Sequence, residues 1–144
     1  MTAFQPSRSP CPIGRAARVL GDRWALLILR EAMMGVETFA VFQRRLAIPR
    51  AALVSRLRWL IEAGVMVRVP PEGRRATYCL TEAGRDLFPT LMAMRQWGDR
   101  WLFGPDHVAM AVPTRHGEPI ASVELRTPSG RRVTFDDRLI PSDG

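Results

Sequence analysis

The segment from Phe39 to Ala63 carries apolar residues at the spacing of two short helices. In the first helix, the apolar positions recur at every third or fourth residue: Phe39, Phe42 and Leu46. In the second helix, they form a longer stripe: Leu53, Leu57, Leu60 and Ile61. Pro49 separates the two helices, because the residue before a proline avoids helical geometry. The pattern therefore predicts a helix-turn-helix whose second helix runs from Pro49 to Ala63.

Two runs with strand character follow this pair of helices. Residues 65–69 and 76–80 are rich in β-branched and aromatic side chains. The residues between them, 70–75, contain two prolines and a glycine and end in two arginines, which is turn chemistry. Two helices followed by a hairpin are the order of a winged helix-turn-helix. Helix-turn-helix modules place their second helix in the DNA major groove.

The flanking segments are also predicted to be helical. Residues 12–21 begin with proline and end with glycine, which is typical of a short helix. Residues 22–35 begin with a capping aspartate and are strongly apolar, so we expect a central core helix. An apolar stripe predicts a long helix over residues 82–103, and Pro89 is expected to kink it or to split off its first two turns.

The composition changes after Gly104, where prolines and glycines interrupt short β-like runs at residues 108–112, 120–125 and 132–135. Residues 128–130 are predicted to form a hairpin turn. The fold class expected is therefore α+β, a winged helix-turn-helix with a β-rich C-terminal appendage. We expect three parts: a flexible arm (1–10), a winged helix DNA-binding domain (11–104) and a C-terminal extension (105–144).

The net charge of +7 is unevenly distributed, and the chain has no lysine. Residues 1–104 hold 16 arginines against 8 acidic residues, a balance of +8, whereas residues 105–144 hold 5 against 6, a balance of −1. A polyanionic partner is therefore expected at the first part of the chain. Arginine suits phosphate and guanine, although an arginine-rich codon usage explains the absence of lysine equally well.

One side of the predicted second helix faces away from its apolar stripe, at 100° per residue. We expect this side and its flank to contact DNA through five residues: Arg50, Ala51, Ser55, Arg56 and Arg58. An ordinary solvated helix face is the alternative. Arg56 lies on the flank, where a phosphate contact and an intramolecular salt bridge are both open.

Arg74 and Arg75 lie at the tip of the predicted wing. There they are expected to reach the DNA backbone or the minor groove, since narrow A·T tracts attract arginine. The alternative is a turn whose charges only aid solubility.

Several function classes lack support in the sequence. Cys11 and Cys79 form no CxxC motif and stand apart from both histidines, so we expect no metal, no cofactor and no disulfide framework. No base, nucleophile or glycine-rich phosphate loop accompanies the acidic residues, so an enzyme is not expected. No apolar run reaches the roughly 18 residues of a membrane span, and the first residues lack a signal pattern. We expect a cytoplasmic protein with no membrane partner.

Three strings resemble the HxlR-type transcriptional regulators of bacteria: CPIGRAARVLGDRWALLILREAMMG, FAVFQRRLAIPRAALVSRLRWLIEAGVMVR and YCLTEAGRDLFPTLMAMRQWG. The resemblance covers about residues 11–103, and its features include Cys11-Pro12 and Trp97-Gly98. It implies a homodimeric winged helix protein that binds double-stranded DNA at a palindromic operator, with the first and last long helices as flanking dimerisation helices. The chain departs from the family at Cys79, where serine is frequent, and in its longer tail.

Some members of that family sense oxidants or electrophiles through the cysteine at the position of Cys11, so the resemblance implies the same role here; a plain small apolar residue is the alternative. Met92, Trp97 and Trp101 are candidates for a small-molecule effector pocket or for a dimer interface. The expected function is a repressor, and a response to a small molecule, electrophile or oxidant is left open. The alternative is an effector-binding or protein-interaction module on a winged helix fold, with little specific DNA binding.

Overall fold

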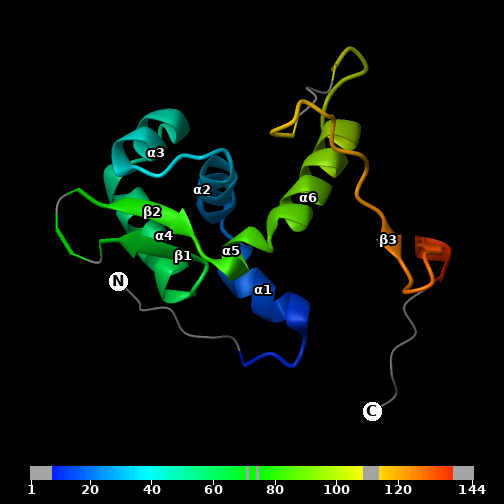
Figure 1. Cartoon of the computed structure of the whole chain (residues 1–144), viewed down its shortest axis with the longest axis horizontal. Coiled ribbons are helices and arrows are strands. Elements are labelled where there is room, and N and C mark those ends of the chain that lie inside the picture. Colours follow the sequence, from blue (N-terminus) through cyan, green and yellow to red (C-terminus); the bar gives the residue numbers. More distant parts are fainter. Residues whose placement is uncertain (1–7, 71, 74, 109–113, 138–144) are drawn as a thin grey trace. The chain divides into compact units, whose positions relative to one another are not determined.

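The structure, a computed structural model, describes residues 8–70, 72–73, 75–108 and 114–137 (Figure 1). Most of the predicted arm, Arg74 and most of the predicted run 108–112 lie outside the described residues. The chain divides into two compact units, Met1–Leu91 and Met92–Gly144, which we describe separately. This division falls inside the last helix, earlier than the change of composition after Gly104, and the domain boundaries expected from sequence stay a prediction.

The first two helices form as their terminal residues predict. α1 (Pro12–Leu20) has Pro12 in its first turn, and Gly21 follows its last residue. α2 (Arg23–Met33) begins after Asp22, whose Oδ1 accepts hydrogen bonds from the backbone N–H groups of Trp24 at 3.0 Å and Ala25 at 3.2 Å. These bonds satisfy donors that the start of a helix leaves without partners. α1 has no buried residue, whereas α2 is the core helix that its sequence predicts.

The predicted helix-turn-helix is α3 (Phe39–Leu46) followed by α4 (Arg50–Glu62). Ala47, in the left-handed region at φ 48°, ends α3, and Pro49 precedes α4 rather than occupying its first turn. Of the predicted apolar stripes, Phe39, Leu46 and Ile61 are half-buried. The remaining stripe residues are fully buried together with three residues of α2: Phe42, Leu53, Leu57, Leu60, Ala25, Ile28 and Leu29. Met34, in the strongly apolar segment 22–35, is 56% exposed. The core therefore lies between α2 and the helix-turn-helix, against which α2 packs.

A buried carboxylate joins α2 to α3. Glu31 is only 2% exposed, and Arg30 Nη2 and Arg45 Nε each lie 2.5 Å from one of its carboxylate oxygens. Breaking such a buried pair leaves an uncompensated charge, which is strongly unfavourable. Glu31 therefore fixes the position of α3 relative to α2.

The wing is the antiparallel pair β1 (Met66–Val69) and β2 (Thr77–Leu80), in which Met66 pairs with Leu80 and Val69 with Thr77. The segment before α3 joins its edge, because Thr38 forms a bridge with Thr77. Arg68 turns back into the wing loop, where it donates hydrogen bonds to the carbonyl oxygens of Pro70, at 2.8 Å, and Gly73. This arginine shapes the loop from inside.

Pro89 has the second of the two effects expected from sequence. The predicted long helix is divided into α5 (Glu82–Arg85) and α6 (Phe88–Trp101), and Pro89 is the second residue of α6. Among the described residues, no helix has the length and the apolar character needed to cross a membrane.

In the second unit, an extended segment is attached to α6 by one side chain. The Gln96 amide donates to the Ala121 carbonyl oxygen at 2.9 Å and accepts from the Val123 N–H at 2.7 Å. The predicted hairpin follows as β3 (Leu125–Arg126) and β4 (Arg132–Val133), and η1 (Phe135–Asp137) is a single 3-10 turn. Within the described residues of the extension, paired strands are limited to this hairpin, so most of the run 120–125 is irregular.

The start of α5 approaches the backbone before β1 closely. Thr81 Oγ1 accepts a hydrogen bond from the Gly84 N–H at 3.2 Å, and its hydroxyl contacts the carbonyl oxygens of Gly64 at 2.7 Å and Val65 at 3.1 Å. Gly84 is buried, and a Cβ atom at this position would lie 2.2 Å from the Val65 carbonyl oxygen. No side chain fits there without a backbone shift.

We predict that Gly84→Ala lowers the free energy of unfolding by about 1–3 kcal/mol, because α5 must move away from the wing. Urea denaturation followed by circular dichroism measures the change. Gly98→Ala is the control, since its added Cβ meets only Leu102 Cδ1 at 3.9 Å. Because alanine favours helices, this variant is expected to gain up to about 1 kcal/mol. Equal losses in both variants would contradict the prediction.

Candidate nucleic-acid interface

The N-terminal half of α4 presents an open face. Arg50, Ala51 and Val54 are exposed there, opposite or beside the buried stripe. The Arg50 guanidinium lies over the ring of Phe39, 5.1 Å from its centroid, which holds this arginine at the junction of α3 and α4. The outward orientation predicted for Arg50 and Ala51 thus agrees with their exposure.

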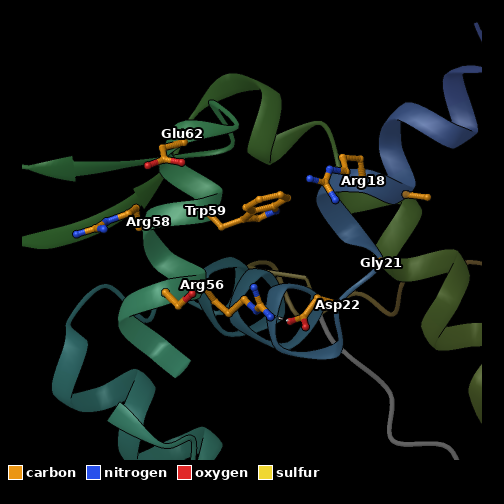
Figure 2. A pocket seen from close by; sticks show the side chains of 9 residues that line it. Arg18, Gly21, Asp22, Arg56, Arg58, Trp59 and Glu62 are labelled. Carbon is orange, nitrogen blue, oxygen red and sulfur yellow. Dashed lines mark ion pairs between the residues drawn. The ribbon is translucent and has the colours of Figure 1, made fainter. Parts of the chain in front are cut away.

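The C-terminal half of α4 faces a concavity that the sequence did not predict. Its volume is about 590 Å³, and the end of α1, the start of α2 and α4 line it (Figure 2). The lining residues are Ala17, Arg18, Gly21, Asp22, Ser55, Arg56, Arg58, Trp59 and Glu62. Ser55 is half-buried and Arg58 is exposed. The outward face of α4 is therefore exposed at its beginning and borders a concavity beside α1 toward its end.

Arg56 forms the intramolecular pair that was one of its two expected roles. Its Nε lies 3.0 Å from Asp22 Oδ1, the same oxygen that caps α2. Figure 2 shows the Arg56 side chain directed at Asp22, while Arg58 points away from both. Arg56 holds α4 against the start of α2, and a role in DNA contact stays a prediction.

Trp59 provides an aromatic surface in the concavity. The Arg18 guanidinium lies 5.0 Å from the centroid of its ring, so α1 and α4 meet through a cation–π contact. Both residues escaped prediction as a pair, because Arg18 lies 41 positions earlier in a helix whose sequence suggests only an apolar side. The available signal in the sequence was the charge of Arg18 on the polar side of an amphipathic helix.

At the wing, Arg75 is exposed, as its position in the loop suggests. Its predicted companion Arg74 lies outside the described residues. The inward side chain of Arg68 leaves Arg75 as the outward cation among the described residues of the loop.

Cys11 is an exposed free thiol immediately before α1. Its N–H donates to Ser9 Oγ at 3.2 Å, and Arg15 donates to the Ser9 carbonyl oxygen at 2.7 Å, so the turn before α1 is ordered by hydrogen bonds. Cys79 is half-buried in β2, with its Sγ 3.9 Å from Thr77 Oγ1. The two cysteines do not form a disulfide with each other.

The aromatic candidates of α6 are only partly brought together. Trp97 and Trp101 are 58% and 67% exposed and line a hollow of about 270 Å³ with residues 122–124 and Arg132. Met92 is half-buried and lies outside the lining of this hollow. Over the described part of the chain, no three His, Cys, Asp or Glu residues gather in a group suited to a metal ion.

Comparison with known proteins agrees with this geometry. Residues 19–105 match the family model described as HxlR-like helix-turn-helix. An uncharacterized HTH-type transcriptional regulator of Mycobacterium bovis is 51% identical over 96 residues, which are 65% of this chain and 61% of that relative. One from Synechocystis is 35% identical over 105 residues, 64% of this chain and 70% of the relative. The chain thus spans about three fifths of the length of the mycobacterial relative.

Solved structures give the same result. PA1607, a proposed transcription factor, superposes with a TM-score of 0.86 at 38% identity, over 94% of this chain and 97% of that one. The redox regulator HypR in its reduced form superposes with a TM-score of 0.54 at 31% identity, over 61% and 90% of the two chains. With a family model matching more than half of its length and a winged helix-turn-helix in its first unit, this chain belongs to the HxlR-like helix-turn-helix family.

Proposed function

We propose that this protein is a bacterial transcriptional repressor that binds a palindromic operator as a homodimer. The observation that carries the proposal is the exposed beginning of α4, with Arg50 and Ala51 facing outward from a helix whose opposite side is buried. A helix anchored on one side and basic on the other fits the major groove. Arg58, exposed two turns later, adds a second cation on the outward side.

These side chains are expected to recognise different parts of the DNA. Arginine binds the O6 and N7 atoms of guanine with two hydrogen bonds, and the small Ala51 permits close approach of α4 to the bases. Arg74 and Arg75 on the wing would bind phosphates or the minor groove. Two such units related by a two-fold axis read half-sites about 34 Å apart, or a multiple of it. A dimer bound there would block access of the polymerase to the promoter.

We predict that two sets of substitutions differ in their effect on specificity. Arg58→Ala is expected to cost about 1–3 kcal/mol on the operator and to relax discrimination at one base pair per half-site. The double variant Arg74→Ala, Arg75→Ala should instead weaken binding to operator and random duplexes alike, with a salt slope smaller by about 2 units per protomer. Fluorescence anisotropy with both duplexes at several salt concentrations measures these effects. A double variant with the slope of the wild type would remove the wing from the interface.

A second copy of the chain would cover apolar residues that a single copy exposes. Ile13 on α1 is 79% exposed, and Trp97 and Trp101 on α6 are largely exposed as well. Exposed apolar side chains of this size mark interaction sites where they gather in patches. The hollow beside the two tryptophans is smaller than the roughly 300 Å³ typical of ligand pockets, which favours a dimer surface over an effector pocket at this place.

We predict that Ile13→Glu converts the dimer to a monomer and weakens operator binding at least tenfold, since a charge on the covered face opposes association. The substitution leaves the core intact because α1 has no buried residue. Light scattering after size exclusion gives the mass, and circular dichroism verifies the fold. Arg15→Gln on the same helix also lowers the net charge by one unit; it is the control and should remain dimeric. A wild-type protein that is monomeric at micromolar concentration would refute the homodimer.

We also propose that Cys11 makes DNA binding sensitive to oxidants. Its thiol is exposed and immediately precedes α1, where a dissolved oxidant can reach it. The similarity to HypR, a redox regulator, supports the proposal.

We predict that diamide, which oxidises thiols to disulfides, abolishes operator binding by the wild type but not by Cys11→Ser. Dithiothreitol should restore the wild-type affinity. Cys79→Ser serves as the control and should respond as the wild type does, because Cys79 is half-buried. Equal sensitivity of wild type and Cys11→Ser in the binding assay would show that Cys11 is a plain small residue.

A further inference from the structure

Arg18 occupies a position whose role the helix-turn-helix alone does not explain. It comes from α1, yet its guanidinium lies over Trp59 of α4 and lines the concavity beside the outward face of that helix (Figure 2). Arg18 is exposed, and it takes part in none of the ion pairs among the described residues. An arginine held by a ring and not neutralised by a carboxylate keeps its charge for an external anion.

The contact with Trp59 prepares Arg18 for binding. A free arginine side chain loses about 2 kcal/mol of rotamer entropy when it is fixed. Stacking over a ring restricts the side chain in advance, and it leaves the N–H groups at the edge of the guanidinium available. When the guanidinium then binds an anion, less side-chain entropy is lost.

The charges around the concavity favour an anion. Its lining includes three arginines, Arg18, Arg56 and Arg58, and two acids, Asp22 and Glu62. Asp22 is already engaged by Arg56 and by two N–H groups of α2. The hollow opens to solvent along α4, and such a surface fits the charged backbone of a polymer.

The length of α4 places this concavity at the edge of a groove. Arg50 and Trp59 are nine residues apart, which corresponds to about 13 Å along a helix. The major groove is about 12 Å wide. If the first turn of α4 inserts between the two DNA strands, Trp59 therefore lies at the height of the sugar–phosphate backbone that borders the groove.

We propose that Arg18, held over Trp59, binds a backbone phosphate of DNA at the edge of the major groove that receives α4. This inference rests on the DNA binding proposed above. It extends the interface from the winged helix-turn-helix to α1, and it assigns to α1 a contact that carries no base specificity. Trp59 is a positioning residue in this arrangement.

The test measures the salt dependence of binding to the operator and to a random duplex, by fluorescence anisotropy. Arg18→Gln is expected to weaken binding to both duplexes by about fivefold to tenfold at 0.1 M salt and to lower the slope by about 0.9 per protomer. Arg18→Lys keeps the charge and should keep the wild-type slope. Arg15→Gln, one turn earlier on the same helix, removes the same charge outside the concavity and should change the slope much less.

Trp59→Leu should reproduce much of the Arg18→Gln loss, and the double variant should be little weaker than either single variant. Circular dichroism should show that Arg18→Gln stays folded and melts only a few degrees below the wild type, since the side chain is exposed and loses only its contact with Trp59. If the wild type binds DNA and Arg18→Gln keeps its slope, the phosphate contact is refuted while the proposed function stands. If the wild type binds neither duplex, the proposed function is refuted and this contact with it.

Discussion

Burial of the apolar stripe of α4 against α2 is the constraint on which the molecule depends. Leu53, Leu57 and Leu60 are excluded from solvent together with Ile28 and Leu29. Each such side chain stabilises the fold by about 1.5–3 kcal/mol. Because the interior is close-packed, neither helix can rotate against the other without steric clashes or voids. Because the helix cannot turn about its axis, its remaining residues have fixed directions. The outward arginines are a consequence of the leucines.

Polar contacts then fix those relative orientations of the elements that apolar packing does not determine. Glu31 joins α2 and α3 through Arg30 and Arg45, and Arg68 gives the wing loop its shape through backbone carbonyls. In these contacts the arginines bind groups of the chain itself. The same residue type therefore has two roles in this chain, since some arginines stabilise the fold and others, such as Arg50 and Arg75, are exposed. Composition alone does not separate the two groups.

The sequence was sufficient where the signal is local. The spacing of Phe42 and Leu57, the break at Pro49 and the cap at Asp22 predicted the helices of the first unit to within a residue or two, because each depends on neighbours in the chain. The contact of Arg18 with Trp59 depends on how α1 lies against α4, and the ion pair of Arg56 depends on how the start of α2 does. No local pattern encodes either arrangement. In the tail, β-branched residues at 120–125 suggested a strand, but the Gln96 side chain takes the hydrogen bonds that a neighbouring strand would supply.

The double use of Asp22 limits how this protein can change. One carboxylate oxygen caps the N-terminus of α2 and also pairs with Arg56 of α4, the helix proposed to enter the major groove. A substitution at position 56 that suited a new target sequence would also disturb the N-terminal cap of the core helix α2. New target sequences are therefore reached more readily through exposed residues such as Ala51 and Val54. On the outward side of α4, the shared oxygen atom distinguishes Arg56, which the fold holds in place, from such positions.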